Sequence, residues 1–430
     1  MEDARTNHGF RRWRISALLA VGVFVNYIDR VNLSVSHDAL HATFGLTDVG
    51  FGWLLSAYNF SYAACQLPVG LLLDRFGVRR IGSISALTVG VASIAAALAR
   101  SIPAFFAARL LLGFGESPLF PGNAKAIGHW FPAQERSFAT SLFDSAAKFA
   151  AAIGVPLIGL LLLQVGWRWS FAATGLLTLV YFGIFTAVYR EPEDDAKLSA
   201  TELTHIRAGQ TQEDATQHGQ TVFSFAELLQ QPKVIGLAIG VMAYNYSFYL
   251  LLTWLPTYLS RALGIDLLHS FLYTGVPWLI ATIVDLAIGG WGVDWLIAKG
   301  FNPGKVRLTF LVVGMAFGMG ILGAGPAHTA VSALFWITLS ISGLSAASPV
   351  IWSAPSLIAP RGNVATVGSM INFSGQLAAI SAPIVTGYIV SRTHNFSAAF
   401  IVAAVFLGIG ITAYLTLLRS VEPMDLQRAG

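Results

Sequence analysis

Residues 84–99 read ISALTVGVASIAAALA, an apolar run that contains no charged side chain. A helix on the surface of a soluble protein keeps a polar face at a 3.6-residue period, but this stretch is apolar on all sides. About 20 such residues, rising 1.5 Å each, cross the ~30 Å hydrocarbon core of a bilayer. The stretch therefore predicts a membrane-spanning helix and argues against a soluble helix bundle.

Similar apolar runs recur along the whole chain. Of the 430 residues, 55% are hydrophobic and only 11% are charged, about half the charged share of an ordinary soluble protein. Twelve runs can be placed in the sequence, each of roughly 18 to 26 residues. The first run is too long for the core of a signal peptide, so we expect it to be retained. The sequence predicts an all-α membrane protein with twelve transmembrane helices.

The basic residues predict the orientation. Most of the 26 lysines and arginines flank one face of the predicted bundle, which the positive-inside rule assigns to the cytoplasm. We therefore expect an integral protein of the plasma (bacterial inner) membrane with both termini in the cytoplasm. This loop placement also accounts for the basic pI, so no nucleic-acid partner is expected. Three basic residues remain within the spans: Arg30, Arg109 and Lys148.

One long polar segment divides the chain into two halves. We predict an N-terminal six-helix bundle over 1–189, a cytoplasmic linker over 190–232 and a C-terminal six-helix bundle over 233–430. The linker is acidic, and we interpret it as solvated. Two capping-box patterns, Ser199 with Glu202 and Ser224 with Glu227, predict short helices within it.

The two halves also repeat each other. GLLLDRFGVRR (70–80) follows the second span, and GGWGVDWLIAKGFNPGKVR (289–307) follows the eighth. Parallel repeats of six helices are typical of a transporter built from two bundles.

Several motifs resemble a known family. GLLLDRFGVRR resembles the loop signature of the major facilitator superfamily. Four further segments resemble its anion:cation symporter branch, which includes sugar-acid and hexuronate transporters. They are NYIDRVNLSV (26–35), the segment 116–137, LLTWLPTYL (251–259) and INFSG (371–375). The resemblance implies two pseudo-symmetric six-helix bundles with rocker-switch alternating access. It implies a gating role for Gly70, Asp74, Arg75, Gly77, Arg79, Arg80 and Asp294. Trp295 stands where Arg75 stands in the first half, and Arg79 and Arg80 could equally be anchors at the membrane surface.

A few charged residues lie within the predicted spans: Asp29, Arg30, Arg109, Glu116, Asp144, Lys148 and Asp285. Each costs at least about 2.5 kcal/mol against lipid and must face a partner or a cavity. Arg109 and Glu116 share a helix face but lie about 10 Å apart, so we expect their partners in the first span. We predict that Asp29 and Glu116 bind protons, that Arg30 binds an anion and that Arg109 links them; the resemblance agrees. The alternative is a static network of ion pairs.

Other polar residues are candidates for contact with the substrate. Lys148 and Asp144 are one helical turn apart and could simply neutralise each other. Alternatively, Lys148 reaches the cavity and favours a substrate with two acidic groups. Hydroxyls of a polyol need neutral hydrogen-bonding partners, for which we propose Tyr27, Tyr62, Tyr244, Asn245, Trp352 and Asn372. Asp285 is expected to be paired or at an interface, with no role assigned.

Composition also limits the other functions. Cys65 is the single cysteine, no phosphate-binding loop occurs, and the histidines fall in loops or at span ends, so we expect no metal, no cofactor and no enzyme activity. We expect a monomeric, proton-coupled symporter that imports a small organic anion, with a sugar acid (aldonate, hexuronate or aldarate) as the first choice. The alternative is an exporter or antiporter of a drug-like or other carboxylate metabolite.

Overall fold

The computed structural model describes residues 9–132, 136–214, 223–359 and 363–424. Every regular element in these ranges is a helix. The elements are α1 (Arg11–Val35), α2 (His37–Phe44), α3 (Asp48–Leu98), α4 (Ile102–Glu116), α5 (Leu119–Trp130), α6 (Arg136–Val188), η2 (Pro192–Asp194), α7 (Ala200–Asp214), α8 (Phe225–Leu229), α9 (Pro232–Leu263), α10 (Leu267–Val284), η3 (Asp285–Gly292), α11 (Val293–Ala298), α12 (Pro303–Gly318), η4 (Met319–Ala324), α13 (Ala330–Ile358), α14 (Val364–Thr393), α15 (Ser397–Ala413) and η6 (Tyr414–Leu418).

These helices supply the twelve expected spans. Nine stretches of the described residues are long and apolar enough to cross a membrane, and one of them, residues 142–188, is 47 residues long and holds two spans. The first arm of α3 and the consecutive helices α4 and α5 supply two more. The predicted all-α membrane fold is confirmed.

α3 and α6 each consist of two antiparallel spans that are joined at a single glycine. Gly77 within α3 has φ +77° and Gly166 within α6 has φ +81°. Side chains with a Cβ rarely adopt this left-handed region. Both reversals thus form with almost no loop, and Gly77 lies inside the 70–80 motif.

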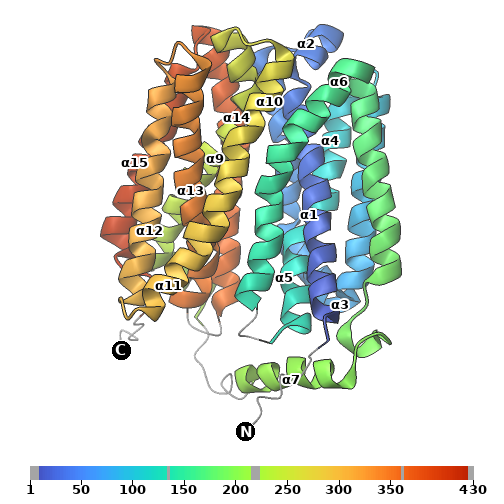
Figure 1. Ribbon diagram of the computed structural model, residues 1–430, viewed down its shortest axis with the longest axis vertical. Coiled ribbons are helices and arrows are strands. Elements are labelled where there is room, and N and C mark those ends of the chain that lie inside the picture. Colours follow the sequence, from blue (N-terminus) through green and yellow to red (C-terminus); the bar gives the residue numbers. More distant parts are fainter. Residues whose placement is uncertain (1–8, 133–135, 215–222, 360–362, 425–430) are drawn as a thin grey trace.

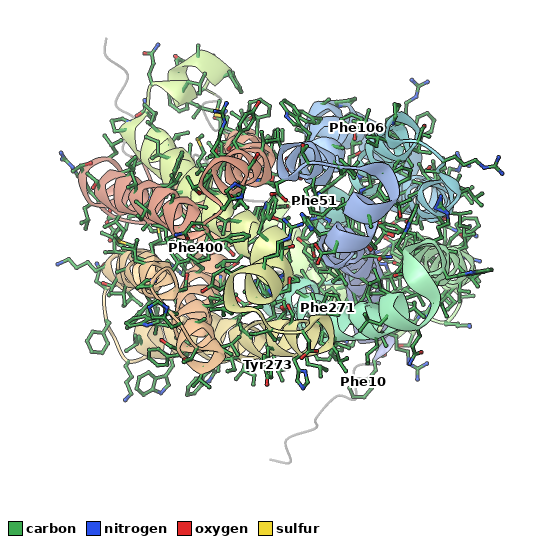
Figure 2. The ribbon with its side chains drawn as sticks, turned by 90° about the horizontal axis from the view of Figure 1, so that it is seen from above. Phe10, Phe51, Phe106, Phe271, Tyr273 and Phe400 are labelled. Atoms are coloured by element: carbon green, nitrogen blue, oxygen red, sulfur yellow. The ribbon has the colours of Figure 1, made fainter. Side chains whose placement is uncertain are left out.

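The spans form two bundles that lie side by side (Figure 1). The N-terminal bundle comprises α1 to α6, and the C-terminal bundle comprises α9 to η6. Both termini and α7 lie at one end, here called the termini side, and α2 lies at the other, here called the α2 side. Seen along the bundle axis, Phe51 and Phe271 lie near the boundary between the bundles (Figure 2).

The linker is less solvated than its composition suggests. Asp195 forms an ion pair with Arg11 at 2.6 Å, and Glu202 forms one with Arg12 at 2.9 Å. Both carboxylates are buried, so the interpretation of the acidic linker as solvated is wrong for these two residues. The physical reason is that the basic start of α1 supplies the countercharge that holds α7 under the N-terminal bundle.

The two predicted capping boxes differ in outcome. Ser224 and Glu227 form a complete box at the start of α8, as predicted. Ser199 accepts from the backbone N–H of Glu202, but the Glu202 carboxylate binds Arg12 instead of returning to the cap. The ion pair therefore replaces half of the second box.

Hydrogen bonds from side chains of α3 to the backbone of α14 join the two bundles toward the α2 side. Ser56 of α3 donates to the carbonyl of Ile380 in α14 at 2.7 Å, and Asn59 donates to that of Ala379 at 3.3 Å. Gly52 lies so close to α14 that an added Cβ would come within 2.6 Å of the Pro383 carbonyl oxygen. Near mid-membrane, Lys148 of the N-terminal bundle also lies 2.9 Å from Asp285 of the C-terminal bundle.

Candidate functional site

A buried ion pair joins α1 to α4 inside the N-terminal bundle. The guanidinium of Arg30 contacts Glu116 through Nε at 2.7 Å and through Nη2 at 2.5 Å. Both contacts go to the same oxygen, Oε2, and the second oxygen, Oε1, is buried without a hydrogen-bond partner. Glu116 is fully buried and Arg30 is 7% exposed, so the pair lies out of contact with lipid and bulk water.

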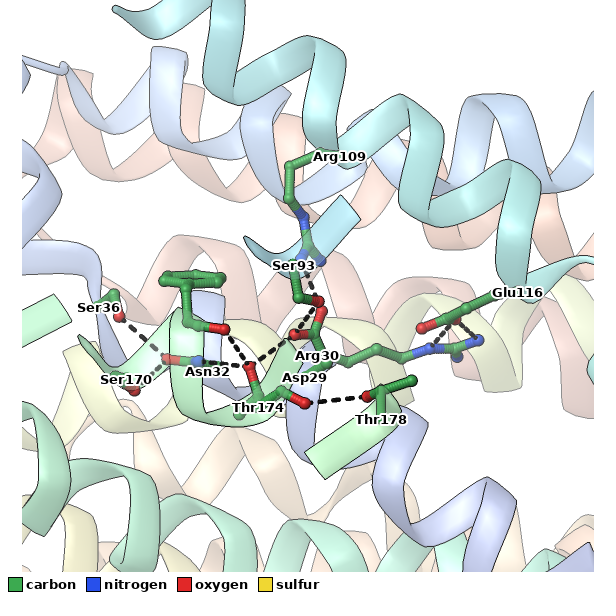
Figure 3. Close-up of polar contacts among 11 residues, drawn as sticks. Asp29, Arg30, Asn32, Ser36, Ser93, Arg109, Glu116, Ser170, Thr174 and Thr178 are labelled. Atoms are coloured by element: carbon green, nitrogen blue, oxygen red, sulfur yellow. Dashed lines mark hydrogen bonds and ion pairs between the residues drawn. The ribbon is translucent and has the colours of Figure 1, made fainter. Parts of the chain in front are cut away.

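A second ion pair lies beside the first (Figure 3). Arg109 of α4 donates to Asp29 of α1 at 3.2 Å. Asp29 also accepts from the hydroxyls of Ser93 at 2.6 Å and Thr174 at 2.9 Å. The partners of Arg109 and Glu116 thus lie in α1, as their spacing indicated. Each pair is neutral in itself. Asp29 accepts from three donor side chains, whereas Oε1 of Glu116 has none.

Four tyrosines surround the Arg30 guanidinium. The rings of Tyr27, Tyr58 and Tyr62 have their centroids 4.4, 4.9 and 5.8 Å from its central carbon. Tyr249 of the C-terminal bundle places its hydroxyl 3.5 Å from Nη1. Aromatic faces attract a guanidinium, and tyrosine hydroxyls can donate to an anion bound there. Arg30 therefore sits in an aromatic setting to which both bundles contribute.

A separate cluster ties the two bundles together. The ammonium of Lys148 lies 3.0 Å from Asp144 of its own helix, 2.9 Å from Asp285 and 3.4 Å from the Ser348 hydroxyl. Asp285 and Ser348 belong to the C-terminal bundle. Tyr244 of α9 lies within electrostatic range of this cluster. Lys148 and Asp144 do pair, and Lys148 also reaches Asp285, for which the sequence suggested no specific partner.

The remaining candidates from the C-terminal bundle occupy different settings. Asn372 donates across the bundle boundary to Gln66 at 3.2 Å. Asn245 donates to the carbonyl of Val241 in its own helix and is buried. Trp352 is 43% exposed, and no contact with either charged cluster is described for it.

The residues of the 70–80 motif are only partly described. Gly77 makes the reversal in α3, and the side chains of Arg75, Arg79 and Arg80 are exposed. Arg79 donates to the carbonyl of Thr186 at 3.4 Å. The placements of Gly70, Asp74 and Asp294 beyond their helical backbone lie outside the described residues.

Sequence reasoning missed the hydroxyls that hold Asp29. Ser93 and Thr174 lie on α3 and α6, far from Asp29 in sequence, and small hydroxyl residues are common in apolar spans. Asn32 extends the network by donating to Thr174 at 3.3 Å and accepting from Ser170 at 2.8 Å (Figure 3). Asn32 lies three residues after Asp29, and this helical spacing was the one signal available.

A further group of ion pairs, here called the α2-side latch, was also missed. Arg261, at the end of α9, lies 2.8 Å from Asp48 and 3.2 Å from Asp38, which belong to the N-terminal bundle. The buried His37 lies between the same two carboxylates. Hydrogen bonding to His37 and the charge of Arg261 lower the pKa of Asp38 and of Asp48 below the ordinary value. The latch crosses the bundle boundary at the α2 side.

A cavity of about 340 Å³ lies between α3 and the C-terminal end of α4, and none of the charged residues of the two clusters lines it. Its lining is almost entirely apolar and includes Cys65, Phe76 and Phe114, with Arg80 at one edge. Such a lining offers an anion few partners. The charged clusters, rather than this cavity, are the candidate site.

Comparison with known proteins places this geometry in a family. A sequence model of the Major Facilitator Superfamily matches residues 19–383. The chain is 38% identical over 423 residues to an uncharacterized transporter of Bacillus subtilis, covering 97% of this chain and 96% of the relative. It is 32% identical over 440 residues to a probable galactarate/D-glucarate transporter of Escherichia coli, covering 99% and 96%.

Solved structures agree on the fold. The chain resembles a bacterial homolog of the human lysosomal transporter Spinster, solved in an inward-facing and occupied conformation, with a TM-score of 0.74, 15% identity and coverage of 96% of this chain and 98% of that one. At this identity the likeness shows the fold alone. From the family match and the full-length relatives, the chain belongs to the major facilitator superfamily, in its branch of sugar-acid and organic-anion transporters.

Proposed function

We propose that the protein imports a small organic anion, a sugar acid in the first place, together with protons. The observation that carries the proposal is the buried Arg30–Glu116 pair, which has one bare carboxylate oxygen and is surrounded by tyrosines of both bundles. The probable galactarate/D-glucarate transporter among the relatives supports this choice of substrate class.

Competition for Arg30 would couple the anion to the proton. A substrate carboxylate matches the guanidinium at least as well as Glu116 does. It can replace Glu116 only if the displaced carboxylate is neutralised, because an unpaired charge in this buried setting costs several kcal/mol. A proton on Oε1 meets that need. Anion binding and protonation of Glu116 then favour each other, as symport requires.

Asp29 would have a different role from Glu116. Its three donors already balance its charge, and a proton there would leave Arg109 without a countercharge. We therefore assign the coupled proton to Glu116 and the fixing of Arg109 to Asp29. This division narrows the expectation that both carboxylates bind protons.

Hydroxyl groups of the substrate would meet neutral side chains near the bundle boundary. Tyr27, Tyr62 and Tyr249 lie around Arg30, while Tyr244 and Asn372 lie on the opposite bundle. A polyol chain that extends from a carboxylate at Arg30 toward the C-terminal bundle would find donors and acceptors on both sides.

Alternating access would follow from exchanging contacts at the two ends. We place the termini side in the cytoplasm, where most of the basic residues lie. The latch and the packing of α3 on α14 would then close the outer side in this state. When the cytoplasmic ends approach, exposed arginines of the motif, such as Arg75 and Arg79, can pair with carboxylates and stabilise the outward-facing state.

Uptake by proteoliposomes tests the proposal. Labelled galactarate and D-glucarate are offered under an inward pH gradient, and we expect accumulation that collapses when the gradient is dissipated. Glu116→Gln should lose the part of gradient-driven accumulation that the Glu116 proton supplies but retain counterflow, because its neutral side chain mimics the protonated carboxyl. Glu193→Gln, which removes an exposed linker carboxylate, is the matched control. Intact gradient-driven accumulation in Glu116→Gln would refute the coupling assignment.

A further inference from the structure

The cluster at the bundle boundary holds more negative than positive charge. Two carboxylates, Asp144 and Asp285, contact the single ammonium of Lys148, at 3.0 and 2.9 Å. The Lys148 side chain is 3% exposed and that of Asp285 is 4% exposed. In the site around Arg30, by contrast, two carboxylates face two guanidinium groups. The two clusters therefore differ by one unit of charge.

A buried excess charge needs compensation. An uncompensated carboxylate in a protein interior costs several kcal/mol, and it is relieved by a proton or by a bound cation. The Lys148 ammonium already occupies the position between the carboxylates that a metal ion would take. The described residues contain no group of three or more potential metal ligands. A proton is the remaining means of balancing the cluster.

Of the two carboxylates, Asp285 is the better site for that proton. Its Oδ2 contacts Lys148, and its Oδ1 is buried with no hydrogen-bond partner. Asp144 is more exposed, at 16%, and pairs with Lys148 within one helix turn. Asp285 also begins η3, a π-helical segment in the middle of a span. Such segments are rare and often occur at functional sites.

We propose that Asp285 is a second proton-binding carboxylate of the transporter and that its protonation weakens the ionic tie between the two bundles. The groups that face it are Lys148 and Asp144 from α6, Tyr244 from α9 and Ser348 from α13. With Asp285 neutral, Lys148 keeps one countercharge, Asp144, which lies on its own helix. The bundles then lose a charged contact near mid-membrane without leaving a charge unpaired.

The inference rests on the proposed function and sets its stoichiometry. One proton on Glu116 and one on Asp285 would accompany each anion, so a dicarboxylate would cross without net charge. Lys148 would not act as a second clamp for the substrate, because its charge is already exceeded by two aspartates. The second acidic group would be tolerated through the second proton rather than bound by Lys148.

Accumulation at a fixed gradient measures the number of coupled protons. With the membrane potential clamped at zero and a gradient of one pH unit, each coupled proton multiplies the limiting accumulation by about tenfold. We expect about 100-fold for the native protein and about tenfold for Asp285→Asn. Asp144→Asn should also give about tenfold, because Lys148 and Asp285 then balance each other. Glu193→Gln is again the control. An unchanged limit of about 100-fold in Asp285→Asn would overturn the inference.

Infrared spectroscopy provides a readout that needs no substrate. In detergent-purified Glu116→Gln protein, we expect a protonated-carboxyl band that shifts in deuterium oxide, and we expect that band to be lost in the Glu116→Gln/Asp285→Asn double variant. A band that persists in the double variant would overturn the inference. If the band depends on Asp285 but no organic acid is accumulated, the proposed function fails and the proton site stands. If uptake is proton-driven but the number of coupled protons does not change in Asp285→Asn, the proposed function stands and the second proton site fails.

Discussion

Removing Arg261 should shift the protein away from the state in which the α2 side is closed. Arg261 joins the bundles through Asp48 at 2.8 Å and Asp38 at 3.2 Å. Its side chain is 34% exposed, and those of Asp48 and Asp38 are 16% and 41% exposed. Pairs with this exposure contribute about 0.2–1 kcal/mol each. Arg261→Gln should therefore cost the closed state about 1 kcal/mol, or about fivefold in the conformational equilibrium.

Distances between spin labels can measure this shift. Replacing the single cysteine, Cys65, leaves a background for labels at the exposed positions Ala42 and His328, one on each bundle at the α2 side. We expect Arg261→Gln to raise the population with a long label distance about fivefold. Arg392→Gln, which removes an exposed arginine at the same side, should leave it unchanged.

Ionic strength supplies an independent check. At 1 M salt the screening length falls to about 3 Å, so the native protein should approach the distribution of Arg261→Gln, while the variant itself changes little. If the variant and the native protein share one distance distribution at low salt, the latch contributes nothing to closure and the reasoning is refuted.

Three other outcomes follow from the structure. The lowered pKa values of Asp38 and Asp48 mean that their contribution to the latch is complete above the ordinary aspartate pKa of about 3.9 and is lost as the pH falls below it; label distances should lengthen in this strongly acidic range. Gly113→Ala should reduce the yield of folded protein, because its Cβ would overlap a backbone carbonyl of α3, whereas Gly183→Ala, with open space around it, should be neutral in size-exclusion profiles. Asp29→Asn should lower the melting temperature strongly, since leaving a buried arginine unpaired costs about 3–5 kcal/mol; a Tm close to that of the native protein would contradict the assigned role.

Much of the fold could be predicted because a bilayer makes strong demands on sequence. A span needs a long apolar stretch, and residues such as 84–99 satisfy it without reference to any other part of the chain. The points at which helices reverse were harder to place. Gly77 and Gly166 replace loops with a single residue of positive φ, and sequence alone distinguishes such a glycine poorly from one that serves helix packing.

The site was predictable to the extent that charge is costly in a membrane. The rarity of charged residues in the spans singled out Asp29, Arg30, Arg109 and Glu116, and the seven-residue spacing implied that α4 needed partners elsewhere. Which carboxylate would keep a bare oxygen depended on hydroxyls from distant helices. The same limit applied to Asp285, because its partner, Lys148, belongs to the other bundle.

The seating of α7 on the start of α1 decides what the linker can report. Because Arg11 and Arg12 hold Asp195 and Glu202, α7 belongs mechanically to the N-terminal bundle. A fluorophore or antibody fragment attached to this helix would therefore report the orientation of the N-terminal bundle relative to the C-terminal bundle during transport.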